Sequence, residues 1–309
     1  MPCYYENKHD VVNEFHRRKK SLGRTERTLK EYSRVLRWFY HDHFPDLTPG
    51  ETQVYHIEEY LYSLGEKDLE QNSKRRYLES LSAFFSWAMK RPRFEDINGN
   101  PAAVVLEEVP KQIKDRPDCA TWGNACKIVQ QIHDPRDKAV AAIMAKTGSR
   151  VSEPLAVRYD DLMLDEGFIR LRERKGDKQT VIPVDDEIRR IVQQVKFVND
   201  SDGNGDECVF KSIRGNRLDR ERLRRVVKKA AYQTGVTEYE DESRFHKKFT
   251  PHTFRTVFTT LMRNEGMKDH ILQYIRGDDS NKKTMDIYTR VDRDEARKEY
   301  LDYIKPIGI

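Results

Sequence analysis

Four side chains, in three stretches far apart in the sequence, suggest chemistry on a phosphate group. Arg150 follows a Thr-Gly turn, His252 and Arg255 stand three positions apart at the start of a predicted helix, and Tyr288 lies near the centre of Thr284–Val291. Residues three positions apart on a helix share one face. The first turn of a helix also has free backbone N–H groups that favour anions. His252 and Arg255 could therefore meet a phosphate together.

These residue types are suited to holding a phosphodiester and attacking it. Guanidinium groups donate paired hydrogen bonds to phosphate oxygens and neutralise the charge of a pentacoordinate transition state. A phenol, with a pKa of about 10, is a weak nucleophile, but nearby arginines stabilise its phenolate, which can form a covalent phosphotyrosine. Such a bond conserves the free energy of the broken phosphodiester, so rejoining needs no cofactor. A lysine at a hairpin tip is a suitable proton donor to the leaving alkoxide.

Other kinds of phosphate chemistry lack their sequence signatures. The chain has no G-x-x-x-x-G-K-[ST] motif for nucleotide hydrolysis and no carboxylate cluster that would suit a two-metal nuclease. Its four cysteines are scattered, and His41-Asp-His43 has no further ligands at the spacing of a zinc site. We therefore expect a reaction that uses no metal ion, ATP or other cofactor.

Helical periodicity dominates the first third of the chain. Helices are expected over residues 1–20, 25–39, 51–63 and 69–90. Thr25 is the expected N-cap of the second helix. Prolines and glycines then recur among charged residues from 91 to 115, where we expect a linker. These features predict a small all-helical domain over residues 1–110.

The rest of the chain combines helices with one hairpin. Further helices are expected over residues 121–132, 135–147, 152–156, 187–198, 219–235, 250–265, 268–275 and 292–303. Alternating apolar residues at 168–172 and 180–184 predict a β-hairpin, and residues 162–164 could add an edge strand. The predicted fold class is therefore mainly α with a small antiparallel β-sheet, and the second domain spans residues 111–309.

Positive charge gathers in the second domain. The formal net charge is +5, while residues 1–110 hold 17 lysines and arginines against 18 acidic residues. The helix over Asp219–Gly235 carries six basic side chains, and within it only Glu221 could neutralise them, which favours insertion into a DNA groove over a merely solvated face. No apolar run approaches the roughly 20 residues that cross a bilayer, and no signal peptide opens the chain. We expect a cytoplasmic protein.

Together these motifs resemble the tyrosine recombinases, the phage-integrase and Xer-like family. The stretch Thr147-Gly-Ser-Arg-Val-Ser-Glu153 is similar to the family's first box, and Thr250-Pro-His-Thr-Phe-Arg255 is similar to its second. The surroundings of Tyr288 resemble those of the family's nucleophile. The resemblance implies catalytic roles for Arg150, Lys175, His252, Arg255 and Tyr288.

In these implied roles, the two arginines and the histidine hold the scissile phosphate and Tyr288 attacks it. Lys175, in the turn between the predicted strands, is the implied general acid, and Lys178 in the same turn is the alternative. Glu153 is implied as a carboxylate that supports Arg150.

One departure from the family pattern lies before the tyrosine. Members usually carry Leu-Gly-His or Leu-Gly-Trp about nine residues before the nucleophile, whereas this chain reads Tyr-Ile-Arg276-Gly277-Asp278-Asp279, with Gly277 11 positions before Tyr288. Asp278 or Asp279 would occupy the place of the missing ring, and we include Asp278 among the catalytic candidates. A carboxylate repels phosphate, so it could orient a neighbouring side chain instead; alternatively, Arg276 donates to the phosphate.

The resemblance implies a site-specific DNA recombinase or integrase, as found in mobile genetic elements, that works through a 3′-phosphotyrosyl link and a free 5′-hydroxyl. It implies a helical core-binding (SAM-like) domain over residues 1–110 and a catalytic domain over 111–309. The expected partners are double-stranded DNA with specific recombination sites and three further copies of the chain, which form a tetramer on two sites. The expected location is the cytoplasm, at the nucleoid.

The alternatives are a catalytically impaired sequence-specific DNA-binding protein and a type IB topoisomerase-like enzyme. The apolar Tyr300–Ile304 patch either docks on a neighbouring subunit or packs within its own chain.

Overall fold

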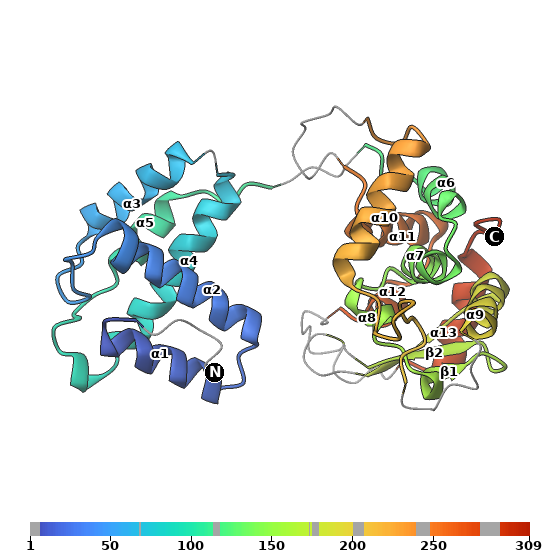
Figure 1. Cartoon of the computed structure of the whole chain (residues 1–309), viewed down its shortest axis with the longest axis horizontal. Coiled ribbons are helices and arrows are strands. Elements are labelled where there is room, and N and C mark those ends of the chain that lie inside the picture. The colour runs from blue at the N-terminus through green and yellow to red at the C-terminus, as the bar shows by residue number, and fades with distance from the viewer. Residues whose placement is uncertain are drawn as a thin grey trace. The chain divides into compact units, whose positions relative to one another are not determined.

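Two separately packed units, Met1–Ile113 and Lys114–Ile309, make up the chain. The computed structural model describes residues 7–67, 69–113, 118–172, 174, 179–199, 207–238, 248–278 and 291–309 (Figure 1). None of the helices in these ranges is both long and apolar enough to span a bilayer.

The first unit is a set of helices around an aromatic core. Its elements are α1 (Asp10–Ser21), α2 (Glu26–Arg37), the π-helical turn η1 (Trp38–His43), α3 (Val54–Glu66), α4 (Gln71–Ala88), the 3-10 turn η2 (Pro92–Phe94) and α5 (Pro101–Glu108). α4 contacts α1, α2, α3 and α5. Phe15 of α1 meets Phe84 and Trp87 of α4 edge to face, with ring centroids 5.6 and 5.5 Å apart. Such pairs add about 0.5–1.5 kcal/mol each beyond the apolar area that they bury.

The helices predicted over residues 25–39, 51–63 and 69–90 are confirmed, the first helix begins later than predicted, at Asp10, and the predicted linker is partly wrong. Thr25 caps α2 by accepting a hydrogen bond from the N–H of Thr28. Residues 101–108, which were expected to lie in a linker, form α5, whose Ala102 and Val105 are buried in the core of the first unit. Asn100 caps this helix, and the proline that follows occupies its first turn, where a missing N–H costs nothing.

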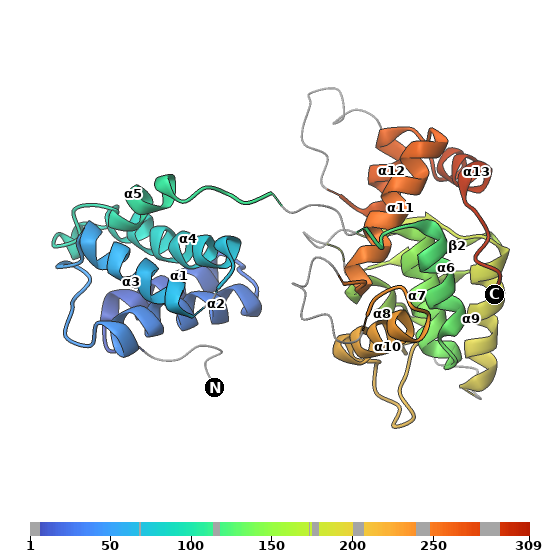
Figure 2. The ribbon, with the colours of Figure 1, turned by 90° about the horizontal axis from the view of Figure 1, so that it is seen from above.

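The second unit surrounds one buried helix. Its helices are α6 (Trp122–Gln131), α7 (Pro135–Thr147), α8 (Ser152–Leu155), α9 (Asp186–Val198), α10 (Arg220–Gln233), α11 (Pro251–Glu265), α12 (Asp269–Arg276) and α13 (Arg293–Tyr303), with a 3-10 turn η3 (Tyr159–Asp161). α7 is buried without interruption from Ala139 to Thr147. It lies among α6, α9, α10 and α11 (Figure 2). A helix that is enclosed on all sides provides a rigid base for the turn at its end.

The predicted hairpin and edge strand are confirmed. Strands β1 (Leu162–Met163), β2 (Phe168–Leu171) and β3 (Thr180–Pro183) form an antiparallel sheet in the order β1-β2-β3. Ile169 pairs with Leu162 on one side and with Ile182 on the other, and these three positions fix the register. The chain is thus mainly helical with one small antiparallel sheet, as predicted.

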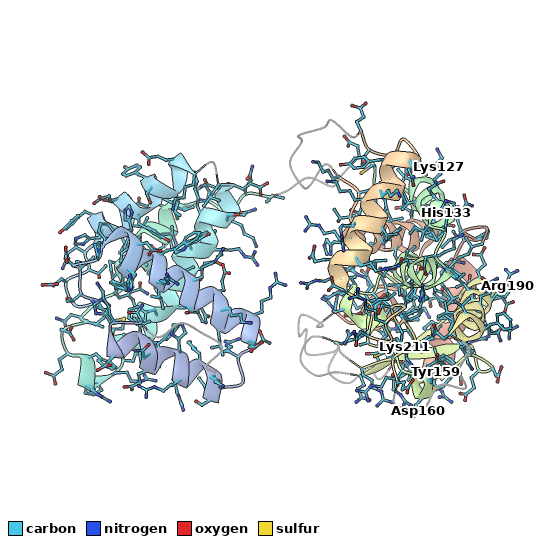
Figure 3. The ribbon with its side chains drawn as sticks, viewed as in Figure 1. Lys127, His133, Tyr159, Asp160, Arg190 and Lys211 are labelled. Carbon is cyan, nitrogen blue, oxygen red and sulfur yellow. The ribbon has the colours of Figure 1, made fainter. Side chains whose placement is uncertain are left out.

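Residues 207–217 lie beside the start of the sheet in this unit. Cys208 forms an isolated bridge with Arg158, and the Lys211 Nζ atom lies 5.8 Å from the centre of the Tyr159 ring (Figure 3). Arg217 then donates a hydrogen bond of 3.0 Å to the carbonyl oxygen of Ser152, at the start of α8. This contact ties the segment to the turn that carries Arg150.

Part of the positive charge of the basic helix α10 is neutralised by acidic residues of another helix. The Arg222 guanidinium pairs with Asp137 at 2.7 Å and with Asp134 at 3.2 Å, both at the start of α7. Spacing within α10 could not reveal these partners of Arg222, because they lie on another helix. Arg224 lies 3.5 Å from Glu221.

At the other end of the unit, α13 packs largely within its own chain. Tyr300 is fully buried in a cluster with residues of α11 and α12, whereas Leu301 is partly exposed. Tyr300 of the Tyr300–Ile304 patch therefore packs within its own chain.

Candidate active site

The first candidate motif forms a tight turn between two helices. α7 ends at Gly148, which adopts φ of +61°, and a Cβ atom there would lie 2.6 Å from the Phe258 ring. Glycine is thus required both by the left-handed backbone and by the close packing of α11. The turn places Arg150 just before the start of α8.

Arg150 is held by the carboxylate that the family resemblance implied. The backbone N–H and the Nη1 atom of Arg150 each donate a hydrogen bond of 3.1 Å to Glu153. Glu153 is almost fully buried, while the Arg150 side chain is about one-third exposed. Glu153 can therefore orient Arg150 without covering the part of the guanidinium that would meet a substrate.

The second candidate motif opens α11. Thr250 and Thr253 form a reciprocal capping box there, with a proline in the first turn, so the helix start is fixed. His252 is exposed, whereas Arg255 is buried with 4% of its surface accessible. Arg255 Nη1 donates to the carbonyl oxygens of Gly148, at 2.6 Å, and of Arg276, at 2.9 Å.

These two hydrogen bonds join three stretches that lie far apart in the sequence. Arg255 reaches the turn after α7 and also the end of α12, where Gly277 adopts φ of +64° and turns the chain into Asp278. The region that departs from the family pattern is therefore part of the same cluster as the two predicted boxes.

Three arginines converge on the carboxylate of Asp278. Arg255 Nη2 donates to Asp278 Oδ1, and Arg150 Nη2 lies 3.5 Å from the same oxygen. Arg276 Nη2 lies 3.1 Å from the other oxygen, Oδ2. The structure thus brings together Arg150, Arg255 and Asp278 from the predicted site with Arg276, the alternative phosphate donor.

Burial and the positive charges of the cluster lower the pKa values of its basic groups. Burial lowers the pKa of Arg255 to about 10, an effect to which Arg276 adds and which Asp278 opposes. Partial desolvation lowers the pKa of His252, and the charges of Arg255, Arg150 and Arg276 lower it further. The lowered pKa of His252 favours a neutral imidazole near pH 7.

Arg174 belongs to the site and was missed by sequence reasoning. Its guanidinium donates to the carbonyl oxygens of Tyr274, at 3.1 Å, and Ile275, at 2.7 Å, and lies 3.6 Å from Glu153. The carbonyls at the end of a helix lack partners within it, so Arg174 caps α12 from the β2–β3 hairpin. It stands in a run of charged turn residues, where no spacing signal marks it as buried.

Lys175, Lys178, Asp279 and Tyr288 lie outside the described residues. Among those that are described, no group of three or more His, Cys, Asp or Glu side chains is arranged to hold a metal ion.

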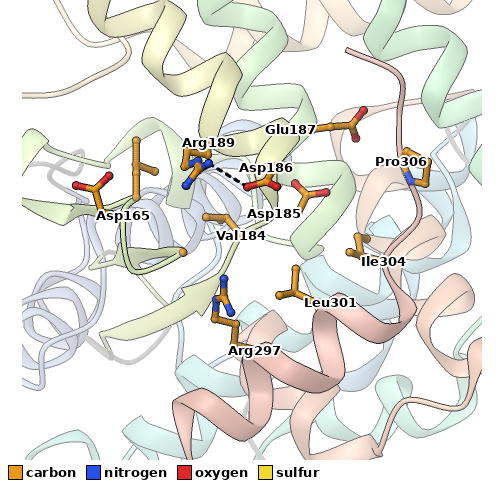
Figure 4. A pocket seen from close by; sticks show the side chains of 12 residues that line it. Asp165, Val184, Asp185, Asp186, Glu187, Arg189, Arg297, Leu301, Ile304 and Pro306 are labelled. Atoms are coloured by element: carbon orange, nitrogen blue, oxygen red, sulfur yellow. Dashed lines mark ion pairs between the residues drawn. The ribbon is translucent and has the colours of Figure 1, made fainter.

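A pocket of about 310 Å³ lies elsewhere in the second unit, between the sheet, the start of α9 and the end of α13 (Figure 4). None of the predicted catalytic residues lines it. Its carboxylates, from Asp165, Asp185, Asp186 and Glu187, would repel a phosphate. The arginine cluster, and not this pocket, is the candidate active site.

Comparison with known proteins covers the part of the chain that holds the cluster. The model of the phage integrase family matches residues 123–295, which contain every residue of the cluster. The chain belongs to this family.

Relatives of this recombinase resemble it over most of its length. It is 28% identical to the tyrosine recombinase XerC of Thermodesulfovibrio yellowstonii, over 91% of each chain. It is 27% identical to XerD of Listeria monocytogenes, over 91% of this chain and 93% of the relative. A λ integrase fragment, solved as a dimer bound to a core site, shares the fold with a TM-score of 0.70 at 17% identity, over 93% of this chain and 99% of the other.

The prediction of a tyrosine-type site-specific recombinase acting on DNA is therefore confirmed, and so is the predicted fold class. As a member of the family, the chain is an enzyme that breaks and rejoins DNA. This places the convergence of Arg150 and Arg255 in the part of the chain that the family shares.

Proposed function

We propose that this recombinase cuts DNA by attack of Tyr288 on a phosphate held by Arg150, His252 and Arg255. The observation that carries the proposal is that Arg150 and Arg255, 105 positions apart in the sequence, meet at one carboxylate oxygen of Asp278. A place where two guanidinium groups share an oxyanion is suited to a non-bridging phosphate oxygen.

Each step of the proposed reaction uses a group of this chain. The Tyr288 oxygen forms a bond to phosphorus, and the bond from phosphorus to the 5′ oxygen breaks. The neutral imidazole of His252 accepts the phenol proton, and Lys175 gives a proton to the leaving 5′ oxygen, with Lys178 as the alternative donor. The products are a 3′-phosphotyrosyl link and a free 5′-hydroxyl, and attack by a 5′-hydroxyl reverses the reaction.

The two domains would have different roles on DNA. We assign duplex binding to the helical domain, predicted as residues 1–110, and catalysis to residues 111–309. The excess of positive charge in the second part supports its contact with the scissile phosphate.

The assembly that we propose is a tetramer on two recombination sites. λ integrase has been solved as a tetramer bound to a Holliday junction, and it shares the fold of this chain with a TM-score of 0.70 at 16% identity, over 93% of this chain and 81% of the other. Since its substrate would be chromosomal or mobile-element DNA, we place the enzyme in the cytoplasm at the nucleoid.

A nicked suicide substrate tests the proposed reaction. Loss of the short 5′-hydroxyl fragment prevents religation, so an active enzyme should accumulate as a protein–DNA adduct that survives denaturation. The adduct should form with the wild type and with the control Tyr303→Phe, and it should be absent from Tyr288→Phe. An adduct in Tyr288→Phe would contradict the assignment of the nucleophile. Adducts at random positions on plasmid DNA, with relaxation of supercoils, would favour the topoisomerase-like alternative.

A further inference from the structure

Arg276 occupies an unusual place for a residue at the end of a helix. Its side chain turns inward over the α7–α8 turn, so that a Cβ atom on Gly148 would lie 3.3 Å from the Arg276 Cγ atom. Only 20% of the side chain is exposed. A basic residue in the last turn normally interacts with the helix dipole from the surface, whereas this one is directed into the arginine cluster.

The backbone of Arg276 is fixed from two sides. Arg174 donates to the carbonyl oxygens of the two preceding residues, Tyr274 and Ile275. Arg255 donates to the carbonyl oxygen of Arg276 itself, at 2.9 Å. The position of the Arg276 side chain therefore follows from the same contacts that hold the rest of the site.

The Arg276 guanidinium has one N–H donor without an acceptor among the described residues. Its Nη2 atom lies 3.1 Å from Asp278 Oδ2, but its Nε atom is buried and has no partner among the described residues. A buried donor without an acceptor is unfavourable. A phosphate oxygen at the position now held by Asp278 would offer acceptors to Arg150, Arg255 and Arg276 together.

Asp278 is placed as a counter-ion for this cluster. Glu153 is already engaged by Arg150 and Arg174. Asp278 opposes the lowering of the pKa of both Arg255 and Arg276, and Glu153 contributes for Arg255 as well. Without Asp278, the charges of these two arginines would therefore be less compensated.

We propose that Arg276 is a third phosphate-binding guanidinium, which takes the role of the ring that family members carry two positions later, and that the Asp278 carboxylate holds the cluster ready until a phosphate displaces it. This proposal rests on the proposed function, since it concerns the same scissile phosphate. Arg276 is then a catalytic residue, and Asp278 is a positioning residue that competes with the substrate.

The test for Arg276 uses DNA whose scissile phosphate is replaced by a methylphosphonate, which lacks the charge of one non-bridging oxygen. Single-turnover adduct formation is measured for the wild type, Arg276→Gln, Arg276→Lys and the control Arg263→Gln, an exposed arginine on α11. On ordinary DNA, Arg276→Gln should slow the reaction by about 100-fold. On one methylphosphonate diastereomer this deficit should nearly vanish, because the contact is already lost.

Arg276→Lys keeps the charge and the helix end but loses the forked donors, so it should lie between the wild type and Arg276→Gln. An equal deficit on both substrates would show that Arg276 acts only through the fold, and a rate equal to that of Arg263→Gln would show that it is not needed. Both results leave the wild-type adduct intact and overturn only this inference. Absence of any wild-type adduct would overturn the proposed function.

The test for Asp278 uses binding without cleavage. In the Tyr288→Phe background, Asp278→Asn should bind its recombination site more tightly, by about tenfold, because no carboxylate competes with the phosphate. Its thermal unfolding temperature should fall when DNA is absent, since the three arginines lose their counter-ion. Binding that is unchanged or weaker would contradict the proposed competition.

Discussion

Arg255 donates a hydrogen bond of 2.6 Å to the carbonyl oxygen of Gly148, across 107 positions of sequence. The bond links the start of α11 to the turn after α7, so the residue that we expect to bind phosphate also positions the turn that carries Arg150. Catalysis and local stability are therefore coupled at this residue.

Arg255→Lys should reduce both catalysis and the stability of the second unit. Lysine cannot reach the carbonyls of Gly148 and Arg276 while also facing a phosphate, because it has one ammonium group in place of a fork. We expect adduct formation on the suicide substrate to fall by about 100- to 1,000-fold, together with a lower unfolding temperature. Arg263→Lys, on the exposed side of the same helix, is the control and should change neither quantity.

Gly148→Ala should destabilise the second unit. The residue has φ of +61°, and its Cβ atom would press against the Phe258 ring. A cost of about 1–3 kcal/mol in the free energy of unfolding is expected, measured by urea titration. The matched control is Gly123→Ala in α6, where the added Cβ atom meets nothing within 4 Å; that change should be neutral or stabilising. Equal effects of the two variants would contradict the packing argument.

Arg174→Gln should impair the proton donor that follows it in the sequence. Arg174 anchors the hairpin to α12, so its loss should displace Lys175 as well as the end of α12. A substrate with sulfur at the bridging 5′ position releases a thiolate that needs no proton. This substrate should rescue cleavage by Lys175→Ala and should rescue Arg174→Gln in part, because the displaced end of α12 is not compensated by the better leaving group. Arg189→Gln should cleave both substrates like the wild type. Rescue of Lys175→Ala alone would show that Arg174 acts elsewhere.

The rate of adduct formation should depend on pH through His252. Desolvation and the neighbouring arginines lower its pKa from 6.5. The imidazole can accept the phenol proton only when neutral, so the rate should rise with pH through a value below 6.5 and then level off near neutrality. In His252→Gln this rise should disappear. A rise centred above pH 6.5 in the wild type would contradict the assignment.

The end of the chain should contribute stability that depends on Glu187. Desolvation raises the pKa of this carboxyl, but hydrogen bonds from Lys146 and from the N–H groups of Ile307 and Gly308 outweigh it and lower the pKa to about 2. The stabilisation is then fully present above the usual value of 4.5 and is lost as the pH falls towards 2. The difference in unfolding free energy between the wild type and Glu187→Gln should shrink over this range, and a constant difference would contradict the linkage.

Local patterns were sufficient to predict most elements and part of the site. Thr25 and Gly148 mark helix ends through capping and backbone preferences, and the spacing of His252 and Arg255 places both at one helix start, so these features are properties of short segments. Residues 101–108 were assigned to a linker because prolines mark both breaks and helix starts.

Contacts between distant segments could not be predicted in the same way. The inward position of Arg276, the burial of Arg174 and the pairing of Arg222 with Asp137 all depend on partners 85 or more positions away or on how helix ends pack. A charged residue in a turn or on a helix gives the same sequence signal whether it is solvated or buried against such a partner.

The central claim is that Tyr288 attacks a phosphate held by the arginine cluster, and mapping the covalent link tests it most directly. Wild-type enzyme is trapped on a suicide substrate and digested with trypsin and nuclease, and the modified peptide is identified by mass spectrometry. Cleavage after Lys283 and Arg290 gives a peptide of residues 284–290, in which Tyr288 is the one tyrosine. We predict a 3′-linked nucleotide on Tyr288 in this peptide. A nucleotide attached to any other residue would contradict the account.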